Sequence, residues 1–305
     1  MAHGFDHTLV VGKESAFGTK ATNFNWLTII DSFEPEENNN TDVRRGIGQR
    51  TAMKLRTGAK EFDASFGGVL QNCRPFFMVL GKEVKTGDAT AGFVHTISPI
   101  GKGEELPSFS FQHNIAGINL LRNYVGGKVD TLTLTAAAEE AVEIEGDMLF
   151  QNIDLTGTAA AVTAELNNYY MFYEGTVKIN NAAVTNISEF ELEISNNLER
   201  VFTLNGKDTP ECIEEGVLDI ALSMTMGCLK ADQWTNFKDG TDITVELTFQ
   251  DVAEPKNSIK ITLSGGKYDT NAIGAGAEDM TEQELEAIFT GISVVGKDTL
   301  TNLFA

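Results

Sequence analysis

Carboxylates are the most numerous side chains capable of chemistry in this sequence, but their spacing defines no catalytic site. Glu139-Glu140 and Glu214-Glu215 are neighbours in the sequence, whereas hydrolysis by paired carboxylates requires two groups held apart across a cleft. The sequence lacks the motifs of serine hydrolases, zinc proteases and phosphate-binding loops, and it has no Asp-x-Asp calcium loop. We therefore expect a protein that is not an enzyme.

The histidines and cysteines indicate no metal ion, cofactor or disulfide framework. The two closest histidines, His3 and His7, are four residues apart, but the segment around them does not have a helical pattern. The three cysteines are odd in number and include no C-x-x-C pair, which indicates free thiols and assembly in a reducing cytoplasm. These cysteines are Cys73, Cys212 and Cys228.

A basic cluster at residues 44–56 stands out in an acidic chain. It reads either as a solvated loop or as a loop that pairs with acidic surface on a neighbouring subunit. A phosphate-binding role is less well supported, because Gly46-x-Gly48 is not followed by the lysine and hydroxyl residue of such loops. The basic side chains are Arg44, Arg45, Arg50, Lys54 and Arg56.

The overall charge limits the possible partners. With 44 acidic and 23 basic residues the net charge is −21, so specific nucleic-acid binding is disfavoured by long-range repulsion. The acidity either serves solubility or forms a surface along which a polyanion slides without sticking. No window of 18 apolar residues is present and the N-terminus is not a signal peptide, so we expect no membrane insertion.

Alternating patterns predict the strands that would position these side chains. Apolar residues alternate with polar or acidic ones at residues 61–66, 108–112, 218–223 and 244–250, as in antiparallel sheets with one packed and one wet face. Residues 26–30 read as another strand. Helical spacing predicts one helix within 69–80 and another within 226–237, and a capping box at residue 281 predicts a third over residues 281–289.

Four short segments recur in the same order along the chain. Residues 33–39 resemble 190–196, residues 62–66 resemble 218–222, residues 109–112 resemble 247–250, and GGKVDT at 126–131 resembles GGKYDT at 265–270. The changing offset places extra residues in the first copy, at 82–103. We therefore predict an N-terminal arm over 1–31, a first β domain over 32–160 and a second, homologous domain over 161–305.

A known family shares two of these segments. The sequence VGKESAFGT at residues 11–19, followed by FNWLTIIDSFEPE at 24–36, resembles the N-terminus of tail tube proteins (major tail proteins) of long-tailed phages. GGKVDTLTL at 126–134 is similar to the strand before the last hairpin of that family. The resemblance implies a mainly β fold of two tandem tail-tube-type β-sandwich or half-barrel domains, each with a flanking α-helix.

The resemblance further implies a structural virion protein that polymerises into stacked rings, which form the hollow tail tube for viral DNA. Two tube domains per chain predict a trimeric ring with pseudo-sixfold symmetry; the alternative is a homohexamer. It also implies assembly in the host cytoplasm, a place in the virion tail, and contacts with the tape measure, tail terminator and distal tail proteins. The competing hypothesis is a secreted or surface β-sandwich binding or adhesin module.

On this hypothesis, the wet strand faces line the channel. The predicted lumen-facing residues are Glu61, Asp63, Ser65, Ser108, Ser110, Gln112, Asp219, Ser223, Glu246, Thr248 and Gln250. The alternative is that these faces are only solvated. The arm, the basic loop and the tail at 297–305 are expected to make contacts between rings. The predicted inter-subunit residues are Glu14, Phe17, Arg44, Arg45, Arg50, Lys54 and Arg56.

Overall fold

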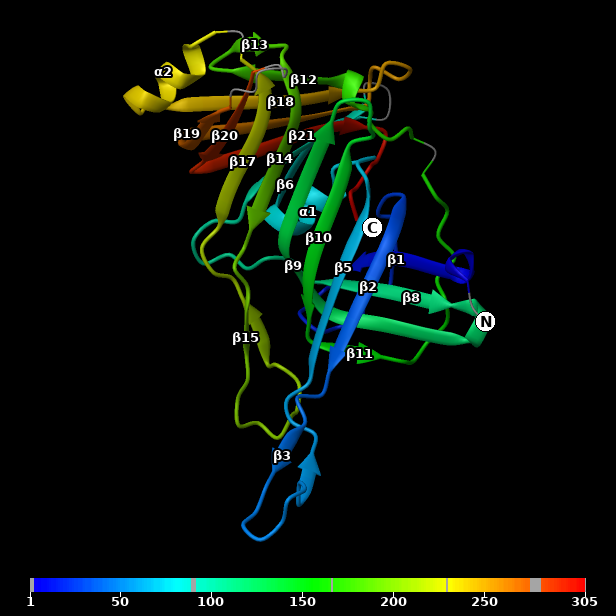
Figure 1. Ribbon diagram of the computed structural model, residues 1–305. Helices are drawn as coiled ribbons and strands as arrows, with labels where there is room; N and C mark the ends of the chain where they lie inside the picture. Colours follow the sequence, from blue (N-terminus) through cyan, green and yellow to red (C-terminus); the bar gives the residue numbers. More distant parts are fainter. Residues whose placement is uncertain (1–2, 89–91, 166, 229, 275–280, 305) are drawn as a thin grey trace.

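A single large antiparallel sheet, here called the main sheet, dominates the molecule (Figure 1). The computed structural model describes residues 3–88, 92–165, 167–228, 230–274 and 281–304, and these residues form a mainly β fold. In spatial order the main sheet contains β2 (Ile30–Asn38), β5 (Glu61–Val69), β10 (Glu143–Phe150), β9 (Leu120–Ala137), β14 (Ile187–Ser195), β17 (Asp219–Gly227), β20 (Glu282–Ile288) and β19 (Ser258–Ile273).

Two smaller layers cover one face of the main sheet, because β9 and β19 are long enough to leave it. The first part of β9 pairs with β8 (Phe109–Ile115) and β11 (Asn152–Asp154), and β8 pairs with β1 (His7–Lys13). The first part of β19 pairs with β18 (Ile243–Gln250) and β21 (Gly291–Asp298). Beyond β18 lie β12 (Gly175–Ile179) and β13 (Ala182–Val184). Short 3-10 turns occupy Gly4–Asp6, Ala116–Ile118 and Phe172–Glu174.

The core lies between the main sheet and these layers. Along β5, the buried Phe62, Ala64 and Phe66 alternate with half-exposed neighbours, as the two-residue period of a strand requires. Helix α1 (Arg74–Leu80) is wholly buried, with Pro75 in its first turn, and it ends at Gly81 with a φ of 86°. Helix α2 (Asp232–Asp239) packs on β19 at the surface.

The extra residues of the first copy, at 82–103, lie largely in a β-hairpin of β6 (Gly81–Asp88) and β7 (Gly92–Pro99), and β7 pairs with β21. Buried His95 fixes this joint, because its ring nitrogens lie 2.5 Å from the Glu83 carboxylate and 3.3 Å from that of Asp298. Burial opposes protonation, but hydrogen bonds to Asp298 and Glu83 outweigh it and raise the pKa of His95 to about 9. An early segment of the chain is thereby attached to a late strand.

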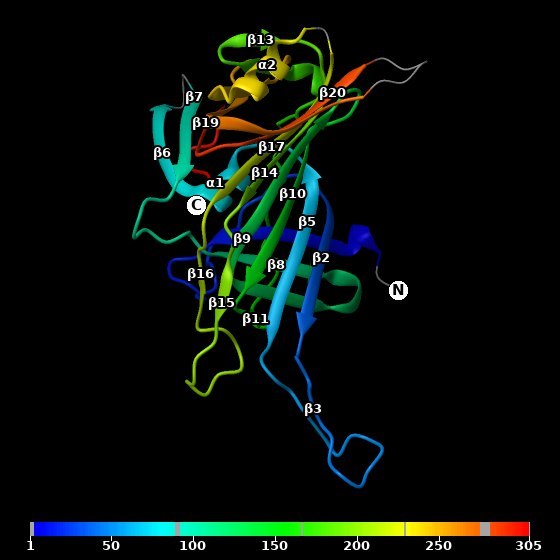
Figure 2. The ribbon, with the colours of Figure 1, turned by 60° about the vertical axis from the view of Figure 1, so that its left-hand side comes forward.

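Two further hairpins extend from one end of the main sheet (Figure 2). The first, β3 (Asp42–Arg44) and β4 (Lys54–Arg56), connects β2 to β5, and the second, β15 (Glu199–Val201) and β16 (Cys212–Glu214), connects β14 to β17. Strands β2 and β14 run in the same direction, because an even number of antiparallel steps separates them. Their hairpins therefore project from the same end.

The second half of the main sheet repeats the chain order of the first: β2-β5-β10-β9 is followed by β14-β17-β20-β19. The GGKxDT segments occupy equivalent places. The ladder of β9 with β10 skips Asp130, and that of β19 with β20 skips Asp269, so both segments carry a bulge at the aspartate. The ladders also place Phe33 and Phe190 at matching positions, opposite Phe66 and Met224.

Two other sequence correspondences shift when the ladders are compared. Phe66 corresponds to Met224, since both lie opposite the matched phenylalanines of β2 and β14, and this moves the predicted match by two residues. Phe109 faces Gly127 and Ile243 faces Gly266, which moves the predicted match of β8 with β18 by four residues. Apolar residues recur at every second position along β5, β17 and β18, so a slip by an even number of residues leaves the apolar pattern unchanged.

Residues 281–289, predicted as a helix, are mainly β20. Buried Gln283, Leu285 and Ala287 alternate with exposed glutamates, and this two-residue period outweighs the capping-box signal at the start of the segment. The strand predicted at 26–30 is also wrong, since β2 begins only at Ile30. The helix predictions within 69–80 and 226–237 contain α1 and most of α2, respectively.

Candidate functional site

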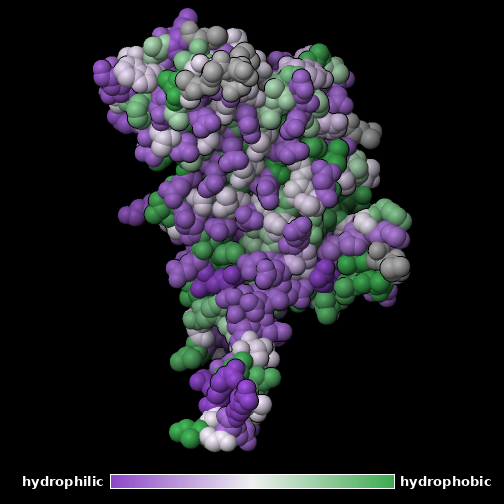
Figure 3. Space-filling model, in the orientation of Figure 1, coloured by the Kyte–Doolittle hydropathy of each residue, from purple (hydrophilic) through white to green (hydrophobic). Residues whose placement is uncertain are grey.

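One face of the main sheet carries no covering layer and is strongly acidic; we call it the acidic face. Side chains that alternate with the core residues point to this side. In Figure 1 the uncovered face is turned to the viewer, and hydrophilic side chains prevail over the same region in Figure 3. Its exposed or half-exposed carboxylates are Glu34, Glu36, Glu61, Asp63, Glu143, Glu145, Asp147, Glu189, Glu191, Glu193, Asp219, Glu282, Glu284 and Glu286.

Few positive charges balance the acidic face. Within the described part of the chain, Arg200 is the basic side chain that pairs with one of these carboxylates, its Nη2 lying 2.5 Å from Oδ1 of Asp63. Burial and then the neighbouring Asp130 raise the pKa of Asp147. The neutral side chains between the carboxylates are small, mainly threonines and serines of β9 and β17. The face therefore projects a negative potential that repels phosphate.

Five of the predicted lumen-facing residues lie on the acidic face: Glu61, Asp63, Ser65, Asp219 and Ser223. They come from β5 in the first half of the main sheet and from β17 in the second. The structure brings them onto one continuous surface, although the segment with Glu61, Asp63 and Ser65 lies far from that with Asp219 and Ser223 in the sequence.

Six predicted lumen-facing residues lie elsewhere. Ser108, Ser110 and Gln112 are buried, so their placement on an open face was wrong: the hydroxyls of both serines donate to Glu14, and Gln112 donates to Asn123. β18 is a strand of a covering layer, and there Glu246 pairs with Lys260 at 2.8 Å. The other two residues of β18 are Thr248 and Gln250.

Sequence reasoning missed most of the carboxylates of this face. The signal was present, because EIEGD at 143–147, EFELE at 189–193 and EQELE at 282–286 each place an acidic residue at every second position. Glu143, Glu145 and Asp147 lie outside the four alternating segments from which the lumen-facing residues were predicted. The segment at 282–286 was assigned to a helix, which scatters its carboxylates around an axis.

Glu14 and Phe17, predicted to contact another subunit, are engaged within the chain. The Glu14 carboxylate is 6% exposed and accepts four hydrogen bonds: from Ser108 Oγ and Ser110 Oγ at 2.7 Å, from Gly126 N at 2.8 Å and from Gly18 N at 2.9 Å. The ammonium of Lys128 lies 5.5 Å from the centre of the Phe17 ring. This part of the sequence therefore anchors the first segment to β8 and β9.

The two chain ends are also docked. The predicted arm contains β1, which pairs with β8 over its whole length. In the tail at 297–305, Leu303 is buried, and the ring of Phe304 lies 5.0 Å from that of Phe109 and 5.9 Å from that of Phe77. Residues 1, 2 and 305 lie outside the described residues. Both segments thus contribute to the fold of the single chain, and their expected contacts between rings stay a prediction.

The basic cluster does lie at an exposed site, on the β3–β4 hairpin. Arg44, Arg45, Arg50, Lys54 and Arg56 are all exposed, and Arg44 pairs with Asp42 at 2.6 Å. Apolar side chains share the hairpin: Val43 is 44%, Leu55 64% and Ile47 106% exposed. Hydrophilic and hydrophobic surface meet on this projection (Figure 3). An exposed hairpin of this composition suits docking to another surface.

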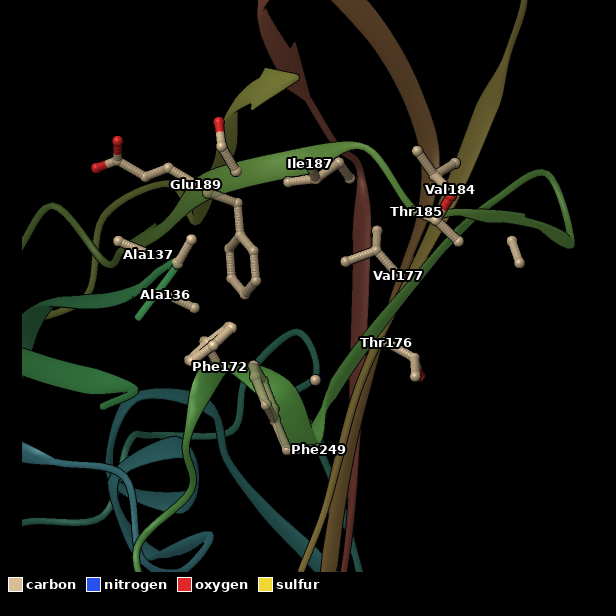
Figure 4. A pocket seen from close by; sticks show the side chains of 15 residues that line it. Ala136, Ala137, Phe172, Thr176, Val177, Val184, Thr185, Ile187, Glu189 and Phe249 are labelled. Carbon is tan, nitrogen blue, oxygen red and sulfur yellow. The ribbon is translucent and has the colours of Figure 1, made fainter. Parts of the chain in front are cut away.

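An apolar groove of about 330 Å³ lies at the opposite end of the main sheet. It is lined where β14 begins and β9 ends, and its lining includes Phe172, Phe249, Val177 and Ile187 (Figure 4). A second groove occupies the matching place beside the start of β2. The chain thus carries exposed apolar side chains on hairpins at one end, and one apolar and one mixed groove at the other.

No group of three or more metal-ligating side chains is found among the described residues. A search of the same residues also finds no helix long and apolar enough to cross a membrane.

The model of a known family, described as phage tail tube protein, matches residues 4–290. The chain belongs to this family. Tail tube proteins are structural components of the virion tail, which implies a non-enzymatic role for this protein. Membership also implies that the chain assembles into a tube with other tail proteins. A comparison with curated proteins gives no match. The family and the mainly β fold confirm the resemblance drawn from residues 11–36 and 126–134.

Proposed function

We propose that this tail tube protein assembles into stacked rings in which the acidic face lines the channel for viral DNA. The observation that carries the proposal is the acidic face itself, a continuous sheet surface with many carboxylates, small neutral residues and little basic compensation. A duplex in such a channel meets repulsion rather than binding, so it passes without sticking. The other face of the main sheet is packed by the covering layers, which would lie on the outside of the tube.

We further propose that the chain contains two tandem half-barrel units. The repeated strand order, the bulges at Asp130 and Asp269 and the matched GGKxDT segments support this division. Gly127 and Gly266 add a shared packing detail: a Cβ atom on either would lie 2.5 or 2.3 Å from the ring of Phe150 or Phe289. In each unit a glycine leaves room for an aromatic ring.

Two units per chain allow a ring of three chains with pseudo-sixfold symmetry. Three chains, each with eight strands in the main sheet, would close a barrel with a backbone diameter of about 48 Å, for strands about 4.8 Å apart and tilted by about 40°. That width accommodates a DNA double helix with space for side chains. Six chains would give about twice this diameter, so the two ring sizes are readily distinguished.

Stacking of rings would use the two ends of the main sheet. The β3–β4 hairpin projects from one end, and the two grooves, of which the one beside β14 is apolar, open at the other. Different surfaces at opposite ends produce head-to-tail contacts that do not close, and hence a filament. The terminal surfaces of the finished tube would meet other tail proteins, such as the tape measure, tail terminator and distal tail proteins.

Electron microscopy of the concentrated protein tests assembly, and cysteine labelling tests which face lines the channel. In a background where Cys212 and Cys228 are serine, Glu145→Cys lies on the acidic face, and the matched control Asp239→Cys lies at the end of α2 on the covering layers. With a bulky polymer-linked maleimide, we expect both variants to react as monomers and only Asp239→Cys to react in tubes. Equal labelling of the two in tubes would place the acidic face outside, and persistent monomers would favour the surface-module alternative.

A further inference from the structure

The main sheet has two open edges. β2 is paired with β5 on one side only, and the second part of β19, from Lys267 to Ile273, is paired with β20 on one side only, among the strands of the described residues. These edges lie at opposite ends of the eight-stranded sheet. Seven strand spacings separate them, about 34 Å, so they do not pair within one chain. An open edge readily pairs with a strand of another molecule.

The middle of the main sheet shows what a completed junction of this kind looks like. There β14 of the second half pairs with β9 of the first, with Glu193 opposite Thr133 and Ser195 opposite Thr131. Asn196 closes the junction: its backbone N–H donates to Asp130 O at 2.8 Å, and its side-chain amide donates to Val129 O at 2.9 Å. The Asp130 carboxylate in turn accepts the N–H of Leu198 at 2.8 Å.

The open edge of β2 ends in the same local structure. Asn40 and Asn197 have positive φ angles of 42° and 49°, and their side chains donate to the carbonyls of Ala59 and Val217 at 3.0 and 2.8 Å. The residue before each asparagine accepts a backbone hydrogen bond of 2.9 Å, from Gly58 onto Asn39 and from Gly216 onto Asn196. Asn39 therefore occupies the place of Asn196.

The two equivalent residues differ in what they contact. Asn196 is 6% exposed and fully engaged, whereas Asn39 is exposed, and its side chain has no hydrogen-bonding partner among the described residues. Asp269, which takes the place of Asp130, is likewise exposed, and its side chain has no hydrogen-bonding partner among the described residues. Both halves of the closing contact are thus present in each chain, at opposite open edges.

We infer that Asn39 of one chain donates hydrogen bonds to the backbone of Tyr268 and Asp269 in a second copy of this chain. The edge strands of the two copies then pair in the register of the β9–β14 junction. This inference rests on the proposed ring. β2 then adds antiparallel to β19, which places Glu36 opposite Ala272 and Asn38 opposite Thr270. The Asn39 N–H meets the Asp269 carbonyl, and its side-chain amide meets the Tyr268 carbonyl.

The register also continues the acidic face from chain to chain. Ala272 and Thr270 share a side of the sheet with Glu284 and Glu286, opposite which they lie on β20. Glu36 lies on the same side, because it is opposite Asp63. A shift by one residue would turn the side chains of β2 to the wrong face, so the continuity of this face restricts the register to even steps. The closing asparagine then selects one of them.

Disulfide trapping tests the register. In the ladder between β14 and β9, Ala138 N donates to Ser188 O and Asn196 N donates to Asp130 O. Hydrogen-bonded and non-hydrogen-bonded pairs alternate along an antiparallel ladder, which makes Glu193–Thr133 a non-hydrogen-bonded pair. Its equivalent between chains, Glu36 and Ala272, would have Cα atoms about 4.5 Å apart, within the range of a disulfide. Glu36→Cys with Ala272→Cys is therefore the test pair, in a background where Cys212 and Cys228 are serine.

Two matched controls accompany the test pair. Thr133→Cys with Glu193→Cys should give a disulfide inside one chain and no oligomers. Glu36→Cys with Thr270→Cys shifts the register by two residues and should cross-link at least tenfold less. For the test pair under mild oxidation at tube-forming concentration, we expect covalent dimers and then trimers on a non-reducing gel.

The outcomes separate this inference from the proposed function. Tubes in the microscope with cross-linking of the shifted pair alone, or of neither pair, would overturn the register and leave the tube intact. Absence of both tubes and cross-links would overturn both. As a second measurement, Asn39→Ala should abolish ring formation with an unchanged melting temperature, whereas Asn196→Ala should lower the melting temperature. A lowered melting temperature for Asn39→Ala alongside normal rings would contradict the closing role.

Discussion

Glu14 offers a sharp test of how the N-terminal segment acts in this chain. Replacement of Glu14 by alanine removes a buried carboxylate that accepts hydrogen bonds from two serine hydroxyls and two backbone N–H groups. Each hydrogen bond to a charged group is worth about 1.5–3 kcal/mol, but water and relaxation recover part of the loss. We expect Glu14→Ala to cost about 3–5 kcal/mol of unfolding free energy.

The expected change in melting temperature is large enough to measure on the monomer. At about 2–4 °C per kcal/mol for a chain of this size, Glu14→Ala should lower the melting temperature by roughly 10 °C. Circular dichroism below the assembly concentration gives the value. Glu14→Gln keeps one acceptor oxygen and should lose less. Glu143→Ala, on the open acidic face, is the matched control and should change stability by less than about 0.5 kcal/mol.

The alternative reading of Glu14 makes the opposite prediction. If the residue acted between subunits, Glu14→Ala would fold and melt like the wild type and fail only in assembly. A wild-type melting temperature together with loss of tubes would therefore refute the assignment of Glu14 to the fold of the single chain.

Three further changes test other parts of the structure. In a denaturant titration, Gly266→Ala should lower the unfolding free energy by about 1–3 kcal/mol because the new methyl group meets the ring of Phe289. The control Gly4→Ala has open space around the new methyl group and should leave the unfolding free energy unchanged. The pKa of His95 is about 9 in the folded protein, above its value in the unfolded chain. Protonated His95 therefore stabilises the fold fully below about pH 6.5, and this contribution is lost as the pH rises through about 9. Between pH 6 and 10 the wild type should lose on the order of 1–3 kcal/mol more unfolding free energy than His95→Gln, and parallel curves of unfolding free energy against pH would contradict this. Pro35→Leu restores an N–H to the open edge of β2 and should lower the concentration at which light scattering reports association; an unchanged threshold would argue against that edge as the contact.

The strand pattern could be read from the sequence wherever one face is apolar and the other polar. The alternation around Phe62 and around Leu247 predicted strands that the structure contains. It did not say which sheet each strand joins, because a strand of a covering layer and a strand of the main sheet show the same two-residue period. Glu246 and Glu61 therefore looked equivalent in the sequence, although they lie on different sheets.

The buried polar residues were the least predictable part of the candidate site. Ser108 and Ser110 alternate with phenylalanines as surface residues do, but Glu14 lies against them and satisfies their hydroxyls. Glu14 lies 94 positions from Ser108 and 96 positions from Ser110 in the sequence. The periodicity of a local segment carries no information about contacts at such a range. The same holds for Asn39, whose role follows only from comparison with the buried Asn196.

The direction in which the acidic face points in the assembled tube is the most direct test of the central claim. Helical reconstruction of tubes by electron microscopy would measure it. We expect the carboxylates of β5, β10, β14, β17 and β20 to face the axis, in a barrel with a backbone diameter of about 48 Å. A tube whose channel is lined instead by the covering layers, with the acidic face turned outward, would contradict the account.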